Sequence, residues 1–161
     1  MATSVERIKV LNVVEKPSVA KMLVRILSNQ YVKELNQSYT FDYQIDDGTD
    51  AGTAFQMVVT SVKGYLKEMT FLSNVRSFKS CEPIELFDVN VDKTPKLESQ
   101  KSTIGHLRRV VEGCKRLYLL LDCDLEGESI AKEVVEVCQE VNSDLLIRRA
   151  RFSSLHKEYV D

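Results

Sequence analysis

The chain has 161 residues, of which 43% are hydrophobic, so it is long enough to bury one substantial core. Its 22 basic and 24 acidic residues leave a net charge of −2, which excludes a protein that binds nucleic acid through overall positive charge. No apolar stretch approaches the roughly 18 residues that a membrane span needs, and no secretory signal begins the chain, so we expect one intracellular domain.

The first elements predicted along the chain are a strand, a helix and a hairpin. Residues 8–14, IKVLNVV, form a short apolar run typical of a buried strand. Apolar residues then recur at helical spacing up to Leu27, and Pro17 and Ser18 suit the start of a helix. The alternating segment from Tyr39 to Ile45, the turn-rich DDGTDAGT and the apolar AFQMVVTSV from Ala54 together predict an antiparallel hairpin.

Helices and strands alternate in the second half of the chain. The pattern is weak over 63–95, where PIELFDV at 83–89 is the strand candidate. We predict a helix over 96–114, a strand over 116–122, a helix over 128–141 and a final strand over 144–152. This alternation predicts an α/β fold of the doubly wound, Rossmann-like type, with a mainly parallel central sheet and helices on both faces. The closing SSLHKEYVD is typical of an element that is not finished, so we expect a fragment of a larger protein.

Carboxylates gather after two of the predicted strands. Glu15 follows the first strand, and Asp122 ends a later one, with Asp124, Glu126 and Glu128 close behind. Functional groups of doubly wound sheets collect beyond the carboxyl ends of the strands, so we expect the two groups to meet if the strands are neighbours. On an extended backbone Asp122, Asp124 and Glu126 point to one side, and clustered carboxylates are ligands that Mg²⁺ takes. We predict that these three residues hold Mg²⁺.

These acids also have structural explanations. Glu126 and Glu128 lie at a helix start, where a carboxylate stabilises the positive end of the helix dipole, and this explanation suits Glu128 best. Glu15 lies beside the acidic cluster, which should raise its pKa and make it a proton donor. Lys16 would then contact a phosphate or restrain Glu15. The alternative is that Glu15 and Lys16 form a solvated acid–base pair in a loop.

Two motifs, in this order, resemble the signature of the Toprim domain. VVEKPSVAK at 13–21 matches its early glutamate segment, and DCDLEGESI at 122–130 matches its D-x-D-x-E-G-E segment. TFDYQI, VVTSVKGYL and RARFSSL are similar to stretches in the N-terminal domain of type IA DNA topoisomerases of the topoisomerase III kind. The resemblance covers essentially all of residues 1–161. It implies a Toprim domain whose larger parent protein carries its nucleophilic tyrosine in a later domain.

The resemblance implies roles for the candidate residues. Glu15 would assist proton transfer to the leaving 3′ oxygen of a scissile phosphate, and Lys16 would touch that phosphate. Mg²⁺ would be held by Asp122, Asp124 and Glu126. The substrate would be single-stranded DNA, which is cut through a 5′-phosphotyrosine, passed and resealed without ATP. A RecQ-family helicase and an OB-fold accessory protein would be partners of the full-length protein, located in the nucleus of a eukaryote or otherwise in the cytoplasm.

Two residues depart from the family pattern. Leu125 stands where the family usually has a basic residue, and Tyr65 stands where it usually has histidine between glycine and leucine. Both departures concern DNA positioning more than metal binding, because the carboxylates are retained. The alternatives are a Toprim nuclease or primase, a haloacid-dehalogenase-like phosphatase and a non-enzymatic protein-binding domain. The phosphatase is disfavoured because Leu-Glu-Gly-Glu, and not Gly followed by Thr or Val, comes after Asp124.

Overall fold

The structure is a computed structural model that describes residues 7–28, 32–35, 38–44, 54–71, 82, 84, 87 and 89–151. Its elements are β1 (Arg7–Val14), α1 (Pro17–Leu27), β2 (Lys33–Leu35), β3 (Ser38–Gln44), β4 (Ala54–Ser61), β5 (Glu68–Phe71), β6 (Val91–Thr94), α2 (Glu98–Val111), β7 (Arg116–Leu120), α3 (Leu125–Gln139) and β8 (Leu146–Arg149). None of the helices in these ranges is long and apolar enough to cross a membrane.

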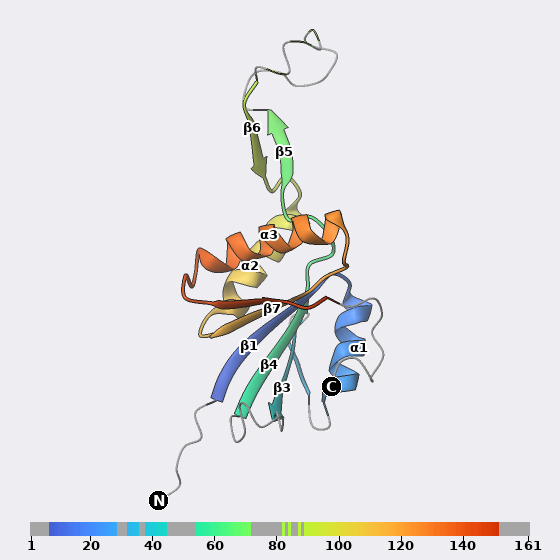
Figure 1. Ribbon diagram of the computed structural model, residues 1–161, viewed down its shortest axis with the longest axis vertical. Coiled ribbons are helices and arrows are strands. Elements are labelled where there is room, and N and C mark those ends of the chain that lie inside the picture. The colour runs from blue at the N-terminus through green and yellow to red at the C-terminus, as the bar shows by residue number, and fades with distance from the viewer. Residues whose placement is uncertain are drawn as a thin grey trace, which may run out of the picture.

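A six-stranded sheet forms the centre of the domain, in the order β2-β3-β4-β1-β7-β8 (Figure 1). β1 is parallel to both of its neighbours, β4 and β7, and β8 continues the parallel part beyond β7. β3 runs antiparallel to β4, from the pair Ser38 and Thr60 to the pair Gln44 and Ala54, which confirms the predicted hairpin. β2 adds a short antiparallel edge to β3. The predicted α/β fold with a mainly parallel sheet is thus confirmed.

Helices cover both faces of this sheet, as predicted (Figure 1). α1 packs on one face, where Val10 and Val14 of β1 and Phe55 of β4 are buried. α2 and α3 pack on the other face, over Leu11 of β1 and Leu117 of β7. Successive residues of a strand point to opposite faces, so the continuous apolar run of β1 fills both cores. Each fully buried side chain of this kind stabilises the fold by about 1.5–3 kcal/mol.

Several predicted boundaries shift. α3 begins at Leu125 and not at Glu128, because the Asp124 side chain caps the helix by accepting a hydrogen bond from the Gly127 N–H. β7 ends at Leu120, before the predicted end at residue 122. α2 is shorter at both ends than the predicted 96–114, and β8 occupies the middle of the predicted 144–152.

A two-stranded arm of β5 and β6 extends away from the main sheet (Figure 1). Its base is held by Glu133 of α3, a carboxylate that is only 2% exposed. Oε2 of Glu133 accepts hydrogen bonds from the N–H groups of Leu66 at 2.8 Å and Lys67 at 3.3 Å, and Oε1 lies 3.3 Å from Nζ of Lys93. The strand predicted over 83–89 lies mostly outside the described residues, and β6 begins after it, at Val91.

Candidate active site

The carboxyl ends of β1 and β7 meet at one edge of the sheet. Val14 ends β1 and pairs in register with Leu120, which ends β7. Since β4 and β7 lie on opposite sides of β1, the sheet grows in opposite directions from this strand, and doubly wound sheets bind ligands at such a point. The structure therefore brings the two groups of acids together. We call the residues that follow these strands the acidic edge: Glu15, Lys16, Asp122, Asp124 and Glu126.

Lys16 lies between the acids of the two strands. Its Nζ atom is 3.8 Å from Oε1 of Glu15 and 3.6 Å from Oδ2 of Asp122. The side chains of Lys16 and Asp122 are 59% and 52% exposed, whereas that of Glu15 is 16% exposed. Water screens the exposed pairs, so they contribute little to stability. Lys16 is therefore available to an external anion, such as a phosphate, that competes with these carboxylates.

Glu15 is fixed in position, and its side chain is largely shielded from solvent. Its backbone oxygen accepts a hydrogen bond from the N–H of Lys63 at 2.8 Å, which ties it to the turn after β4. Burial raises the pKa of Glu15, the Asp122 carboxylate raises it further, and Lys16 lowers it by a smaller amount. The acids at the start of α3 raise it slightly more. The direction is the predicted one, but burial is a larger cause than the acidic neighbours.

The second aspartate of the motif is the N-cap of α3. Asp124 has an extended backbone, with φ −134° and ψ 179°, and its Oδ1 atom accepts the Gly127 N–H at 2.7 Å. Helical conformation begins at Leu125, so Glu126 lies in the first helical turn. The prediction that Asp122, Asp124 and Glu126 share one side of an extended segment is therefore wrong beyond Asp124. Glu126 instead lies where the positive end of the helix dipole favours a carboxylate.

Gly127 allows α3 to start very close to the end of β7. A Cβ atom at this position would overlap the carbonyl oxygen of Asp122 and would lie 3.0 Å from the carbonyl carbon. α3 is in turn anchored in the core by Ile130 and Val134, which are fully buried. Helix packing therefore determines where the backbone of Asp122 lies, and glycine is the residue that permits this approach.

Arg149, the last residue of β8, hydrogen-bonds to the end of β7 and to the loop between β7 and α3. Its guanidinium donates hydrogen bonds to the backbone oxygens of Asp122 at 2.8 Å, Ala150 at 2.6 Å and Leu119 at 3.3 Å. Its Nε atom is 3.1 Å from Oε1 of Glu128, so Glu128 has a structural role, in line with its prediction as helix-start support. In the sequence Arg149 is the first residue of the RARFSSL stretch, and the sequence pattern assigns it no role of its own. The available signal was an arginine at the end of a strand, opposite an acidic loop.

The acidic edge offers the hard oxygen ligands that a divalent cation such as Mg²⁺ takes. Asp122, Asp124 and Glu126 are all exposed, so an ion can reach them from solvent. Within the described ranges no three Asp, Glu, His or Cys side chains lie close enough together to hold an ion in their present positions. The donor chemistry thus suits a hard dication, and the carboxylates would rotate toward it on binding. Which residues bind the ion stays a prediction.

The two departures from the family pattern lie at the surface. Leu125 is 92% exposed at the first position of α3, so a basic side chain there would stand beside the acidic edge. Tyr65 is 44% exposed and follows Gly64, whose φ of 100° lies in the left-handed region. Neither residue contributes a carboxylate to the edge.

The Toprim domain family matches residues 10–155 of this chain. The doubly wound sheet and the acids beyond β1 and β7 are therefore those of a Toprim domain, and the chain belongs to that family. Toprim domains generally bind a divalent metal.

Similarity to individual proteins indicates which kind of Toprim protein the chain resembles. The chain is 41% identical over 154 residues to DNA topoisomerase 3-alpha of Arabidopsis thaliana, and 37% identical over 160 residues to DNA topoisomerase 3 of Dictyostelium discoideum. It is 36% identical over 155 residues to DNA topoisomerase 3-alpha of Homo sapiens. These matches cover 92%, 95% and 91% of this chain but only 16%, 19% and 15% of the three relatives. The expected similarity to topoisomerase III proteins is thus confirmed.

Proposed function

We propose that this chain is the Mg²⁺-binding Toprim half of a topoisomerase III active site. The observation that carries the proposal is the position of Lys16, which lies within 4 Å of carboxylates from two neighbouring strand ends, at 3.8 and 3.6 Å. Acids and a lysine at this point of the sheet suit a phosphodiester substrate. The similarity to proteins named DNA topoisomerase 3 supports DNA as that substrate.

Each residue of the acidic edge has a proposed task. Lys16 contacts the scissile phosphate in place of its present carboxylate partners. Glu15, whose pKa is raised by burial and by Asp122, gives a proton to the leaving 3′ oxygen. Asp122, Asp124 and Glu126 hold Mg²⁺. A bound Mg²⁺ would stabilise charge that develops on the phosphate oxygens.

The proposal extends to the full-length protein. A tyrosine outside this chain attacks a single DNA strand to form a 5′-phosphotyrosine, and the break is resealed after strand passage without ATP. A RecQ-family helicase and an OB-fold protein are proposed partners, and the nucleus is the proposed location in a eukaryote. The chain spans less than a fifth of the three relatives, at 15–19% of their length, so these steps require residues beyond it.

Magnesium titration tests the metal site. Calorimetry should show weak Mg²⁺ binding to the chain, and Asp122→Asn with Asp124→Asn should abolish it. Asparagine also caps helices well, so α3 should remain folded in this double variant. The matched control is Asp92→Asn with Asp144→Asn, which removes two charges from exposed aspartates elsewhere on the surface. Unchanged Mg²⁺ binding in the first variant, or equal losses in both, would refute the assignment.

A cleavage assay tests the proposed division of the active site. The chain alone should form no covalent adduct with a labelled single-stranded oligonucleotide, because no tyrosine in it matches the family's nucleophile. A labelled band of the protein's mass on a denaturing gel would contradict this. The full-length protein should form the adduct, and Glu15→Gln should reduce it.

The exposure of Leu125 favours one alternative, a domain that mainly binds a protein partner. An apolar side chain that is 92% exposed beside the acids suits such a contact better than it suits DNA. Under this alternative the chain binds no Mg²⁺, so the same titration separates the two functions.

A further inference from the structure

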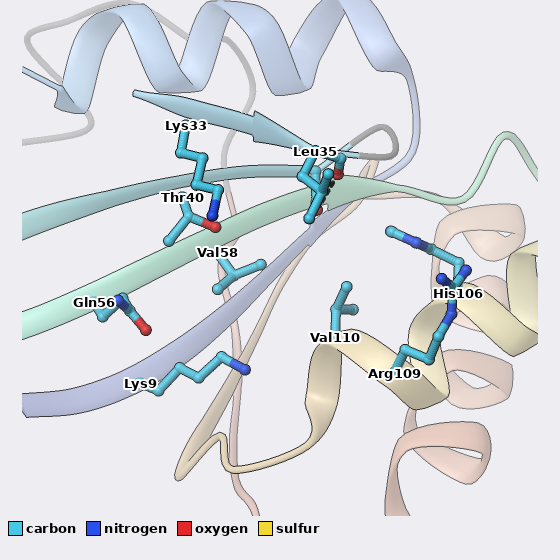
Figure 2. A pocket seen from close by; sticks show the side chains of 10 residues that line it. Lys9, Lys33, Leu35, Thr40, Gln56, Val58, His106, Arg109 and Val110 are labelled. Carbon is cyan, nitrogen blue, oxygen red and sulfur yellow. Dashed lines mark hydrogen bonds between the residues drawn. The ribbon is translucent and has the colours of Figure 1, made fainter. Parts of the chain in front are cut away.

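A concave surface separate from the acidic edge lies between α2 and the sheet face formed by β1, β2, β3 and β4 (Figure 2). Its volume is about 400 Å³, and no residue of the acidic edge lines it. Figure 2 shows Lys9 and Lys33 on the sheet side and His106 and Arg109 on the α2 side of the same space. We call this surface the basic cleft, defined by those four residues and by the polar floor residues Ser38, Thr40 and Gln56.

The floor of the basic cleft is polar because of strand alternation. Lys33 pairs in register with Thr40, and Gln56 pairs with Lys9, so polar side chains form neighbouring pairs across the sheet. The residues between them in β3 and β4 point to the opposite face and pack with α1. On the cleft side, by contrast, the apolar core lies mainly between β1, β7, α2 and α3. This part of the sheet therefore presents hydrogen-bonding groups toward the space beside α2.

The positive charges of the cleft are not neutralised by carboxylates in the described ranges. Nζ of Lys9 donates to the backbone oxygen of Glu112 at 2.7 Å, and Nε of Arg109 donates to that of Gly105 at 3.3 Å. Both acceptors are neutral carbonyls, and Lys33 has no carboxylate within ion-pair distance among those residues. The nearby Asp42 is paired with Arg7 at 3.3 Å. The cleft thus keeps a net positive charge despite the overall charge of −2.

We propose that the basic cleft binds the phosphate backbone of a nucleic-acid strand, as a contact separate from the acidic edge. Cations stand on both walls, which suits a ligand with repeated negative charges better than a single anion. Leu35, Val58 and Val110 add apolar surface against which a sugar or base can rest. A volume of about 400 Å³ is within the range of small-ligand pockets and accommodates a nucleotide unit. This inference rests on the proposed function, in which the protein acts on DNA.

Fluorescence anisotropy with a labelled oligothymidylate, measured without divalent metal, tests the cleft. Lys33→Gln with Arg109→Gln should weaken binding several-fold. It should also reduce the slope of log affinity against log salt by about 1.4, because each lost phosphate contact on a single strand removes about 0.7. The matched control is Lys101→Gln with Lys132→Gln, which removes two exposed charges outside the cleft. Lys33→Arg with Arg109→Lys keeps the charges and should retain binding.

Three results would overturn the inference. The first is no binding of the oligonucleotide by the unsubstituted chain, and the second is an equal loss in the cleft variant and its control. The third is displacement of the oligonucleotide from the cleft by an equal concentration of a competitor. Displacement by inorganic phosphate or free thymidine monophosphate would assign the cleft to a small anion, and displacement by hexaglutamate would assign it to an acidic peptide. The proposed function can be refuted without refuting the cleft. This is the outcome if the chain with Asp122→Asn and Asp124→Asn retains Mg²⁺ binding while the cleft variant loses DNA binding.

Discussion

Replacing Gly127 with alanine should destabilise the domain, although alanine is normally the better helix residue. The added Cβ atom would overlap the carbonyl oxygen of Asp122 and lie 3.0 and 3.3 Å from its carbonyl carbon and nitrogen. These are backbone atoms and cannot rotate away as a side chain could. The start of α3 and the end of β7 would have to separate, and the proposed metal ligand Asp122 would move with them.

The size of the effect follows from two opposing terms. Overpacking a tight site costs about 1–3 kcal/mol, and the helix preference of alanine over glycine offsets about 0.5–1 kcal/mol of this. We expect a net loss of about 1–2 kcal/mol in the free energy of unfolding. For a chain of 161 residues this lowers the midpoint of thermal unfolding by roughly 2–8 °C.

Gly105 of α2 provides the matched control. It is also a helical glycine, but apart from its chain neighbours and the nearby backbone of its own helix a Cβ atom there would meet no atom within 4 Å. Gly105→Ala should therefore stabilise the domain by about 0.5–1 kcal/mol. Urea unfolding followed by circular dichroism measures both variants. If Gly127→Ala proved as stable as Gly105→Ala, the close approach of α3 to β7 would be refuted.

Two further predictions concern titratable groups. The folded pKa of Glu15 is raised above its usual 4.5, so the stability that its protonated form contributes is present below pH 4.5 and is lost as the pH rises through the folded pKa. In metal-free buffer, the free energy of unfolding of Glu15→Gln relative to that of the unsubstituted chain should therefore increase between pH 4 and pH 7. An equal pH dependence of the two chains would contradict the burial of this carboxyl. Burial also raises the pKa of Cys114 to about 11 and that of Cys138 to about 12, whereas Cys123 is exposed. In a Cys81→Ser background a maleimide should label Cys123 first, as mass spectrometry of peptides would show, and equal labelling of the three cysteines would contradict the burial of Cys114 and Cys138.

Hydrophobic patterning was sufficient to predict most of the fold. The run from Ile8 to Val14 is apolar at five of its seven positions, on both faces of the strand, which indicates a strand buried on both faces, and β1 lies in the interior of the sheet. Pro17 marked the start of α1 because proline suits the first helical turn. The convergence of Glu15 and Asp122 then followed from the general rule that parallel strands end at one edge of a sheet.

The local geometry of the acids could not be predicted in the same way. Asp124 could be read as one residue of an extended ligand set or as a helix cap, and the choice depended on where α3 begins. The 2.7 Å bond from the Gly127 N–H to Asp124 is local to the first turn of α3. Where that turn lies depends on the close packing of α3 against the end of β7, which is a tertiary effect. The role of Arg149 was hidden for the same reason, since its acceptors lie up to 30 residues away in the sequence.

The buried carboxylate of Glu133 has a consequence for how the domain opens. It joins α3 to the backbone N–H groups of Leu66 and Lys67, where the arm leaves the main sheet. These two amides can exchange their hydrogen with solvent only when α3 separates from the loop, so their protection should approach that of the core. Amides nearer the far end of the arm, such as that of Phe71, should exchange through local fraying. We therefore expect the base of the arm to open together with the body of the protein, and the part further out to open by itself.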